Sequence, residues 1–392
     1  MKVPFADITR DERETLIDGE NVESRIRKNI LDVAERKNFV LGDYVEKFEK
    51  SFAEYCGVKH CIGVANGLSA LELALISMGV VPGDEVITVA NTFNATAAAI
   101  AKIGAEPILV DANEKDFNMD MKQIEKALTR KTKAIIPVHL YGQTVDINLL
   151  RKTAREIPII EDACQAHGSR FNEKRAGSFG IMGCFSFYPG KNLGCYGDGG
   201  AITTNNDQLA EFLKKTRNYG QTKKYCHDIR PDNSRLDTIQ AAVLVEKLKV
   251  LDKWNEAREN NAQIYKTELA NVSEIKLPTE RARGEHVYHL FVIRAPNRDK
   301  LSKYLEEKQI QTGLHYPVPI HKQKCFQKSN PDRSMNLFMR ADSVPYNTKE
   351  TFPISEKLAD EILTLPMFPT MKEEEIKYVS NSIKDFYSKK SF

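Results

Sequence analysis

The sequence has little net charge, no long apolar run and no internal repeat. Its 57 Lys and Arg residues nearly balance 54 Asp and Glu residues over 392 positions, which gives a formal net charge of +3. A chain so close to neutral has no bulk attraction for nucleic acid or for an anionic membrane. No apolar run approaches the roughly 18 residues of a membrane span, and the start of the chain lacks the apolar core of a signal peptide. We therefore expect a cytoplasmic protein that binds neither nucleic acid nor membrane.

The cysteines lack any paired spacing. There are seven, an odd number, and no two of them form a C-x-x-C motif. This scatter argues against a disulfide framework and against a zinc site, so we expect reduced thiols and no bound metal. The glycine cluster at 194–200 likewise lacks the G-K-[ST] ending of a nucleotide-binding loop. These absences leave a globular chain whose 41% hydrophobic residues suffice for more than one domain.

Short apolar runs alternate with helical patterns through the middle of the chain. The predicted strands lie at 85–89, 107–110, 133–138 and 158–160, with helices between them near 94–103, 120–128 and 146–155. This alternation is typical of βαβ units in a mostly parallel sheet covered by helices, so we expect an α/β fold. The apolar spacing from Leu236 to about Leu269 predicts one long helix that leads out of the sheet.

The remainder of the chain predicts a second, smaller unit. A strand is expected at 286–293, and helices are expected near 298–308 and 355–363. The stretch 322–352 is rich in Lys, Asn, Ser and Pro, which predicts a long irregular loop. We therefore expect a large domain over residues 1–250 and a smaller α+β domain over residues 251–392.

One lysine stands between an aromatic strand and a glycine-rich turn. Side chains at 185–188 alternate as in a half-buried strand, and Pro189-Gly190 ends the strand just before Lys191. Open sheets bind their ligands at such strand ends. Most lysines are solvated surface charges. A lysine held in a semi-enclosed pocket, however, can form a Schiff base with the aldehyde of pyridoxal phosphate, and this context favours that role for Lys191.

A carboxylate follows the strand predicted at 158–160. Asp162 stands at the carboxyl end of this strand, where it would point into the ligand crevice. A paired Asp is the usual means of keeping the ring nitrogen of pyridoxal phosphate protonated. The alternative is that Glu161 or Asp162 only caps the next helix. His167, nearby in a run of small residues, is more often a core histidine than a functional one.

A polar turn precedes an apolar helix in the first part of the chain. Asn66 and Gly67 lead into the run that begins at Leu68. Free backbone N–H groups and the positive end of the helix dipole bind phosphate at such a helix start, and Gly67 allows close approach. Any capped helix looks similar, so this turn is a phosphate site only in combination with the lysine and the aspartate.

These three elements, in this order, resemble the DegT/StrS family of sugar-nucleotide aminotransferases. The resemblance extends along nearly the whole chain, and the matching stretches are 4–7, 82–88, 90–96, 136–143, 233–237, 312–317 and 365–369. It implies the aspartate aminotransferase-like fold of pyridoxal-phosphate enzymes (fold type I). The large domain would then bind the cofactor through a mostly parallel sheet, and the smaller α+β domain would follow it.

The resemblance also implies a role for individual residues. Lys191 would hold pyridoxal phosphate covalently and act as general acid and base. Asp162 would pair with the pyridinium nitrogen, and Gln165 would touch the phenolic oxygen of the ring. Phe93 would stack on the cofactor ring, which an aromatic face can do at little entropic cost.

The phosphate of the cofactor would be held by two chains. The backbone amides of Gly67 and Leu68 and the hydroxyl of Ser186 are implied to bind it, together with Asn233 of the partner subunit. This arrangement implies a two-fold homodimer with shared active sites. The family more often has a small hydroxyl residue where this chain has Asn66 and Leu68, so contacts at Leu68 can come only from the backbone.

Four residues are implied to bind the sugar nucleotide: Tyr188, Arg235, His315 and Tyr316. Many family members carry His where this chain has Tyr188, and the Phe-Tyr-Pro-Gly-Lys variant resembles the members that aminate the sugar at C-3. Arg235 has a structural alternative as an ion-pair partner of Asp237 or of another carboxylate. The charged loop at 219–230 is open to two interpretations, since it could close over the diphosphate or be an ordinary exposed loop.

The resemblance implies a transamination in two halves. L-Glutamate would give its amino group to the cofactor, which would pass it to a nucleotide-linked keto-hexose. We expect dTDP-3-keto-6-deoxyhexose as the acceptor and dTDP-3-amino-3,6-dideoxyhexose as the product, a deoxyamino sugar for lipopolysaccharide or another glycan. The alternatives in the same fold are a C-4 keto-sugar aminotransferase and an aminotransferase for a UDP-linked 3-keto sugar acid.

A rival of another class is a non-catalytic regulatory or binding protein that keeps the fold. The pair Lys191 and Asp162 argues against it, because a protein that only binds has no use for a lysine and an acid that together stabilise a carbanion. A sugar dehydratase of this fold would need another residue in place of Lys191. We therefore expect an enzyme.

Overall fold

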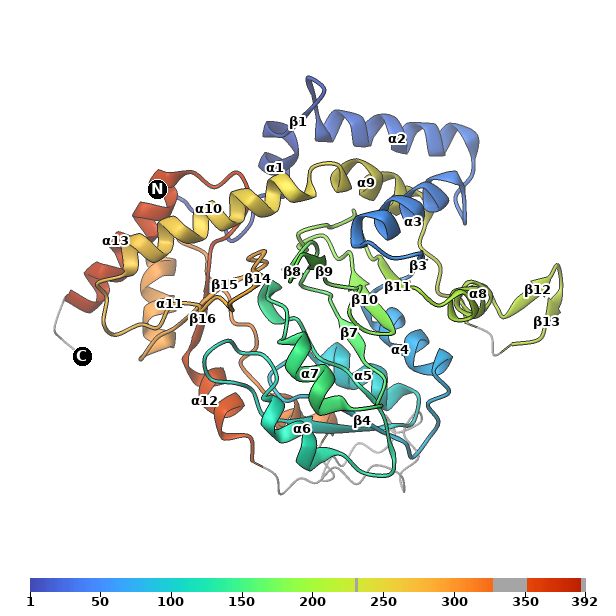
Figure 1. Cartoon of the computed structure of the whole chain (residues 1–392). Coiled ribbons are helices and arrows are strands. Elements are labelled where there is room, and N and C mark those ends of the chain that lie inside the picture. Colours follow the sequence, from blue (N-terminus) through green and yellow to red (C-terminus); the bar gives the residue numbers. More distant parts are fainter. Residues whose placement is uncertain (230–231, 327–350, 389–392) are drawn as a thin grey trace.

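The computed structural model describes residues 1–229, 232–326 and 351–388 and builds its largest part around one mixed sheet (Figure 1). The strand order is β3-β11-β10-β7-β6-β4-β5, in which isolated parallel bridges join β7 to the segment of β6. Among these strands only β11 runs antiparallel to its neighbours. The strands are β3 His60–Val64, β4 Glu85–Val89, β5 Glu106–Val110, β6 Thr132–Ile135, β7 Ile160–Asp162, β10 Met182–Ser186 and β11 Gly200–Thr204. The predicted α/β fold with a mostly parallel sheet is confirmed.

Helices follow the strands as the alternation predicted. They are α3 Asp43–Cys56, α4 Gly67–Ser77, α5 Asn94–Lys102, α6 Met121–Ala127, α7 Ile147–Ala154 and α8 Asp207–Thr216. The strand predicted at 158–160 lies two residues later, as β7. Pro158 has no N–H to donate, although its carbonyl accepts from Ile135 N. Asp162 is therefore the last residue of the strand itself.

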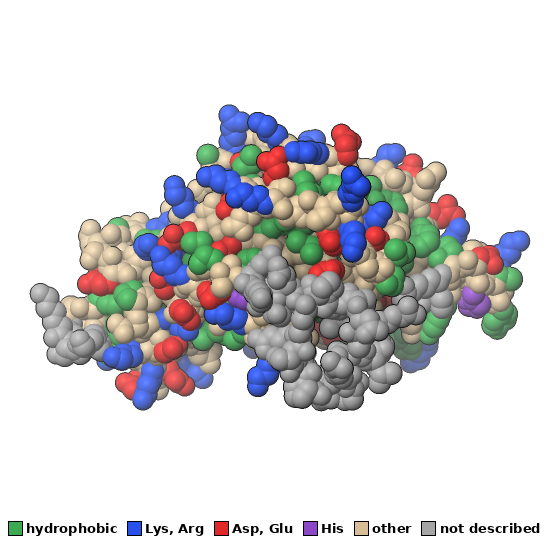
Figure 2. All heavy atoms as spheres, turned by 90° about the horizontal axis from the view of Figure 1, so that it is seen from below, with side chains coloured by type: hydrophobic (Ala, Val, Ile, Leu, Met, Phe, Trp, Pro, Cys, Tyr) green, Lys and Arg blue, Asp and Glu red, His purple; other side chains and the backbone are tan. Residues whose placement is uncertain are grey.

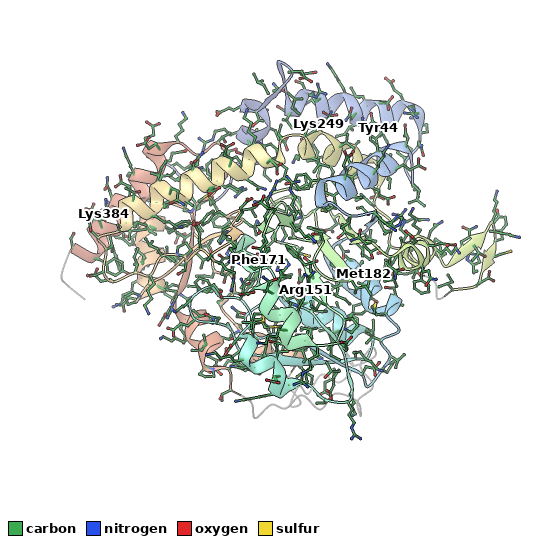
Figure 3. The ribbon with its side chains drawn as sticks, in the orientation of Figure 1. Tyr44, Arg151, Phe171, Met182, Lys249 and Lys384 are labelled. Carbon is green, nitrogen blue, oxygen red and sulfur yellow. The ribbon has the colours of Figure 1, made fainter. Side chains whose placement is uncertain are left out.

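The helix predicted as continuous from Leu236 to Leu269 is two helices, so that prediction is wrong. They are α9 Thr238–Leu248 and α10 Leu251–Leu269. Lys249, labelled in Figure 3, and Val250 separate them, and Val250 has a non-helical backbone with φ −116° and ψ 4°. The side chain of Val250 is buried against Val243 and Trp254. Tertiary packing thus overrides the helical periodicity at this junction.

The C-terminal part has its own small sheet and its own apolar cluster. Its elements are β15 Phe291–Arg294 paired antiparallel with β16 Ile362–Leu365, and the helices α11 Arg298–Glu307, α12 Pro353–Glu361 and α13 Glu373–Ser388. Tyr265, Phe291 and Phe368 are buried in this cluster, and Val3 from the start of the chain packs with them. The boundary predicted at residue 250 stays a prediction. Most of the irregular loop predicted at 322–352 lies outside the described residues.

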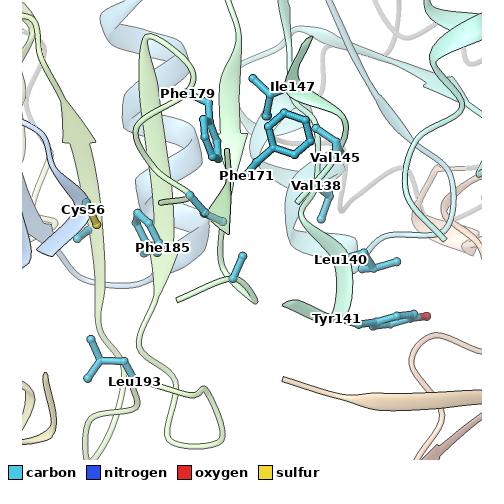
Figure 4. Close-up of a cluster of buried hydrophobic side chains, with 14 of the residues drawn as sticks. Cys56, Val138, Leu140, Tyr141, Val145, Ile147, Phe171, Phe179, Phe185 and Leu193 are labelled. Carbon is cyan, nitrogen blue, oxygen red and sulfur yellow. The ribbon is translucent and has the colours of Figure 1, made fainter. Parts of the chain in front are cut away.

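The main sheet lies between two apolar clusters. In the first, the rings of Phe52 and Phe185 meet edge to face with centroids 4.9 Å apart, and Figure 4 shows the part of this cluster around Phe185. The second contains Leu71 of α4 together with Met182 and Ile202 of β10 and β11. Successive strand residues point to opposite faces, and each face packs against one of the two clusters, so both faces are buried. The functional groups must then lie at the strand ends.

Charged side chains of both signs are interspersed on the surface face shown in Figure 2. On α2 (Val22–Arg36), Arg27 pairs with Glu23 at 2.8 Å and Arg36 pairs with Asp32 at 3.2 Å, each one helical turn apart. Exposed pairs of this kind are screened by solvent and contribute little to stability, so the fold does not depend on them. No helix in the described part of the chain combines the length and the apolarity needed to cross a membrane.

A fully buried carboxylate joins three segments behind the sheet. Glu161 of β7 accepts hydrogen bonds of 2.7 Å from the backbone N–H groups of Gly177, Phe179 and Gly180, and its Oε2 lies 3.0 Å from His139 Nε2. The two side chains of this pair are inaccessible to solvent. Such a carboxylate is costly to bury unless its acceptor sites are occupied, as they are here. The helix-capping alternative for Glu161 is therefore wrong.

We expect Glu161→Gln to destabilise the protein by about 3 kcal/mol, because an amide places N–H groups against backbone N–H donors inside the core. Urea unfolding monitored by circular dichroism measures the loss. Glu54→Gln, at an exposed glutamate of α3, is the matched control and should unfold with the wild type. Equal midpoints for all three proteins would contradict the role given to Glu161.

Candidate active site

Several strands of the main sheet end at one cavity of about 580 Å³. Of the twelve residues predicted for the site, ten line this cavity: Gly67, Leu68, Phe93, Asp162, Gln165, Ser186, Tyr188, Lys191, His315 and Tyr316. Residues from both ends of the chain complete the lining, and Met367 N donates a 3.3 Å hydrogen bond to Phe5 O there. The cavity therefore lies where open sheets bind ligands, at the carboxyl ends of the strands.

Asp162 is held in one orientation by two donors. Thr96 Oγ1 on α5 donates to its Oδ2 at 2.8 Å, and the backbone N–H of Cys164 donates to its Oδ1 at 3.2 Å. The hydroxyl of Thr92 lies 3.2 Å from that of Thr96. The carboxylate is only 5% exposed but lines the cavity, so it can pair with a cationic group of a ligand there.

Lys191 lies on a tight turn after β10. Its backbone N–H donates to Tyr188 O at 2.9 Å, and a Cβ at Gly194 would come within 2.4 Å of Pro189 O, so the turn needs glycine there. Burial lowers the pKa of Lys191 below its ordinary value, although Cys164 and Asp162 act against this shift. A larger share of the amine is then neutral at physiological pH, and a neutral amine is the nucleophilic form.

The first turn of α4 offers unpaired N–H groups. Asn66 Oδ1 caps the helix by accepting from Ser69 N at 2.8 Å, and Asn66 O accepts from Ala70 N at 3.0 Å. The amides of Gly67 and Leu68 have no acceptor among the described residues. A Cβ at Gly67 would lie 2.7 Å from Ser186 Cβ, so only glycine leaves room between the two segments. The turn is an anion cradle with the Ser186 hydroxyl beside it.

Phe93 and Tyr316 form an aromatic wall of the cavity. The ring of Phe93 is 52% exposed, and its centroid lies 5.2 Å from that of Tyr316. Gln165 connects this wall to the core, because its Oε1 accepts from Tyr141 N at 2.7 Å and its Nε2 donates to Tyr316 Oη at 2.9 Å. Burial raises the pKa of Tyr316, so its hydroxyl stays protonated and can donate to a ligand.

Two histidines that line the cavity are neutral at physiological pH. Burial, with Lys191 close by, lowers the pKa of His315 to about 4, and its Nδ1 lies 2.8 Å from Thr364 Oγ1. Burial also lowers the pKa of His289 well below its ordinary value. Its Nδ1 lies 3.2 Å from Asn192 Oδ1. The Asn192 amide nitrogen is used elsewhere, in bonds to Asn255 and Val287, so His289 Nδ1 carries the proton and Nε2 is left as an acceptor.

Two predicted residues do not reach this cavity. Asn233 is exposed, and Arg235 donates to Asn218 Oδ1 at 2.8 Å with its guanidinium 5.3 Å from the ring of Tyr219. No ion pair joins Arg235 to Asp237 or to any other carboxylate of the described residues. The neighbouring loop forms the hairpin of β12 Gln221–Lys223 and β13 Cys226–His227, which projects from the body at the right of Figure 1. Arg230, at the end of that loop, lies outside the described residues.

His167 belongs to the core, as predicted. Its ring is fully buried, with centroids 5.4 Å from Phe185 and 5.7 Å from Phe187. The sequence analysis also missed further polar residues of the cavity, among them Thr96, Cys164, Arg258 and His289. Thr96 stands in the matching stretch 90–96 and could have been found there, whereas Arg258 looked like any polar residue of a long amphipathic helix.

The residues present fit pyridoxal phosphate. The cradle at Gly67 and Ser186 suits a phosphate, the exposed face of Phe93 suits a planar ring, and Asp162 and Lys191 suit its two reactive positions. A lysine, an aspartate and an anion cradle at the strand ends of a mostly parallel sheet define a pyridoxal-phosphate-dependent enzyme of fold type I.

Residues 20–384 match the DegT/DnrJ/EryC1/StrS aminotransferase family. The chain belongs to this family, and it is a pyridoxal-phosphate-dependent aminotransferase. A solved structure, DesV of S. venezuelae in complex with a ketimine intermediate, superposes with a TM-score of 0.90 at 37% identity over 100% of both chains. The predicted family, fold type and cofactor are thereby confirmed.

Two curated relatives carry different descriptions. The dTDP-3-amino-3,6-dideoxy-alpha-D-galactopyranose transaminase of Aneurinibacillus thermoaerophilus is 43% identical over 373 residues, 94% of this chain and 98% of the relative. The pleiotropic regulatory protein of Geobacillus stearothermophilus is 42% identical over 391 residues, 99% of each chain. Both matches span nearly the full length of this chain and of the relative.

We expect sodium borohydride to fix pyridoxal phosphate onto Lys191, because that amine is the lysine nitrogen in the cavity and reduction makes its bond to the cofactor permanent. Peptide mapping by mass spectrometry locates the added mass. Lys191→Ala should retain the fold and carry no such label. A label on any other lysine would contradict the assignment.

We expect Asp162→Asn to keep the fold and lose about 10- to 100-fold in transamination rate, because the cofactor nitrogen loses a charge-assisted hydrogen bond. Single-turnover absorbance measures the rate. Asp198→Asn is the matched control, since Asp198 also lines the cavity but is exposed. Comparable rates for the two variants would rule out the pairing role of Asp162.

Proposed function

We propose that the enzyme transfers the amino group of L-glutamate to C-3 of a dTDP-linked 3-keto-6-deoxyhexose. The observation that carries this proposal is the cavity that unites Lys191, Asp162 and the anion cradle at Gly67, in a chain 43% identical to a dTDP-3-amino-sugar transaminase over almost its whole length. The Tyr188 variant of the lysine motif supports C-3 as the position of amination.

The residues of the cavity divide the chemistry among them. Bound pyridoxal phosphate supplies an electron sink that makes loss of a proton next to nitrogen accessible. Asp162, fixed by Thr96 and Cys164 N, keeps the ring nitrogen protonated. Lys191 would anchor the cofactor and, once its amine is free, would take the proton from the carbon of the amino donor and, in the second half, return a proton to the sugar carbon. His289 Nε2, the acceptor left by the Asn192 contact, can receive a hydrogen bond from an amine in the cavity.

The mouth of the cavity suits the larger substrate. Tyr188 is 60% exposed and Phe93 is 52% exposed, whereas Tyr316 and His315 are less exposed. Remote binding energy of a sugar nucleotide at such a mouth can orient its keto carbon toward the cofactor. Tyr316 Oη, held by Gln165, is placed to donate to a sugar oxygen.

We also propose a homodimer with shared sites. Asn233 and Arg235 lie outside their own chain's cavity and are at least partly exposed, so they are free to serve the cavity of the partner. The projecting hairpin of β12 and β13, next to them in sequence, would serve the sugar-nucleotide side.

The seven free cysteines support a reducing compartment, and we propose the cytoplasm.

A panel of substrates tests the proposed reaction. The protein loaded with pyridoxal phosphate is incubated with L-glutamate and with dTDP-linked 3-keto, dTDP-linked 4-keto and UDP-linked 3-keto sugars, and the products are identified by mass and NMR. Amination of the dTDP-linked 3-keto sugar with the highest kcat/KM is the expected result. Preference for either other sugar would overturn the substrate, and no amination of any sugar would favour the regulatory rival.

Complementation tests the shared site. Lys191→Ala and Asn233→Asp chains, the second of which sets a carboxylate against the phosphate, are each expected to be inactive. A mixed dimer purified through two different tags should recover about half the wild-type rate, because one of its two sites combines an intact lysine with an intact Asn233 of the partner subunit. An inactive mixed dimer would show that Asn233 serves its own chain.

A further inference from the structure

His289 and Lys191 line the same cavity, and each has a nitrogen with unused hydrogen-bonding capacity. The ring of His289 is partly buried, and no described residue forms a hydrogen bond with its Nε2. The Nζ of Lys191 likewise forms no hydrogen bond with any described residue. Neither nitrogen is among the unpartnered polar atoms that are sealed from solvent, so both are accessible. A ring nitrogen and an amine are thus both open to one space.

A chain of side-chain amides that ends on backbone carbonyls fixes the proton of His289 on Nδ1. Asn255 Nδ2 donates to His167 O at 2.8 Å, so Asn255 Oδ1 is the atom that accepts from Asn192 Nδ2 at 2.9 Å. Asn192 Nδ2 also donates to Val287 O at 2.9 Å. A carbonyl can only accept, and Asn192 therefore turns its Oδ1 toward the ring, 3.2 Å from Nδ1. The ring donates from Nδ1 and keeps the lone pair of Nε2 for the cavity.

His289 stays neutral at physiological pH because it is buried among cationic and basic groups. Burial lowers its pKa well below the ordinary value, and the charges of Lys191 and Arg258 act in the same direction. His167 and His315 are the two other titratable rings that disfavour a positive charge there. Nε2 is therefore an acceptor, and not a donor, throughout the physiological range.

Other polar groups of the cavity are less suited to hold an amine in place. His315 Nδ1 lies 2.8 Å from Thr364 Oγ1, and since a hydroxyl can donate or accept, either ring nitrogen of His315 can carry the proton. Asp162 already accepts from two donors, and Asp198 is exposed to solvent. His289 instead combines a partly buried position with an acceptor that is fixed before any ligand binds.

We propose that His289 is a positioning residue, whose Nε2 accepts a hydrogen bond from the free amine of Lys191 and holds that amine toward the reacting carbon. An acceptor suits this task in both protonation states, because the neutral amine and the ammonium each have N–H groups to donate. A donor in its place would bind the lone pair of the neutral amine, which is the electron pair that takes the proton from carbon. The fixed tautomer of His289 leaves that lone pair free. This inference rests on the proposed function, because it assumes that Lys191 moves a proton.

Two substitutions separate the acceptor from the contact with Asn192. His289→Gln sets an amide oxygen near the position of Nε2, His289→Phe keeps a ring without nitrogen, and both lose the Nδ1 donor. The pKa of Lys191 is measured in the cofactor-free full-length protein from the pH dependence of its acetylation, located by peptide mapping. We expect His289→Phe to lower this pKa by about 1, because the ammonium loses a charge-assisted hydrogen bond, and His289→Gln to leave it nearly unchanged.

In the holoenzyme, single-turnover absorbance with glutamate deuterated at its α-carbon gives a second readout. We expect His289→Phe to slow the first half-reaction about 10-fold and to increase the deuterium isotope effect, because proton transfer to Lys191 becomes more strongly rate-limiting. The dependence on glutamate concentration should stay unchanged, because the substitution removes no contact to the donor. His289→Gln should stay within about threefold of the wild-type rate.

His286→Asn is the matched control. His286 is also a buried histidine whose pKa is lowered by burial, and its Nδ1 accepts from Tyr288 N at 3.0 Å, but it does not line the cavity. This variant should leave the pKa of Lys191 and the rate unchanged. Equal losses in His289→Gln and His289→Phe would overturn the proposal and leave His289 a structural partner of Asn192. An unchanged pKa of Lys191 in His289→Phe would overturn it as well.

A measurement on the unaltered protein covers the case in which His289→Phe fails to fold. Nitrogen-15 NMR of the histidine-labelled protein distinguishes the two neutral tautomers, and the signals of His289 are those absent from His289→Gln. We expect the proton on Nδ1, and a proton on Nε2 would overturn the proposal, because no acceptor would then be open to Lys191. Failure of the protein to aminate any sugar would instead overturn the proposed function. The tautomer and the pKa of Lys191 are measured without substrate, so the two failures are distinguishable.

Discussion

The burial of Glu161 is the constraint on which the active site depends. Successive residues of a strand point to opposite faces, so the hydrogen bonds that hold Glu161 behind the sheet also determine that Asp162 faces the cavity. His139 takes part twice, since its ring contacts Glu161 and its backbone N–H donates to Asp162 O at 3.0 Å. A slip of one residue in this strand would exchange the two carboxylates and leave the cofactor nitrogen without a partner.

The sequence was most informative where function depends on position along a strand. Lys191 and Asp162 were predicted to share one crevice because both follow apolar runs, and the structure places both in one cavity. The bounds of β7 were missed, because the donor that Pro158 lacks matters only once a neighbouring strand is known. The break at Val250 was missed because the packing of Val250 against Trp254 is a tertiary property that periodicity does not contain.

The cavity residues that the sequence analysis missed were missed for one physical reason. Arg258 and His289 enter the cavity from segments far from the lysine in sequence, and the burial that lowers the pKa of both groups arises only on folding. Local patterns identify which residues could react, whereas the free capacity of a buried polar group can be counted only in three dimensions. Arg258 and His289 could therefore not be predicted from the sequence, whereas the residues that suit the cofactor could.

The contact between Met367 N and Phe5 O joins the first and last parts of the chain at the cavity. During translation, residues emerge at about 5–20 per second and N-terminal segments fold first. The segment around Phe5 must therefore wait for most of the chain to be made before its partner exists. The wall that encloses the cofactor is completed late in synthesis, so a ribosome-bound chain presents an open cofactor site and a truncated chain never closes it.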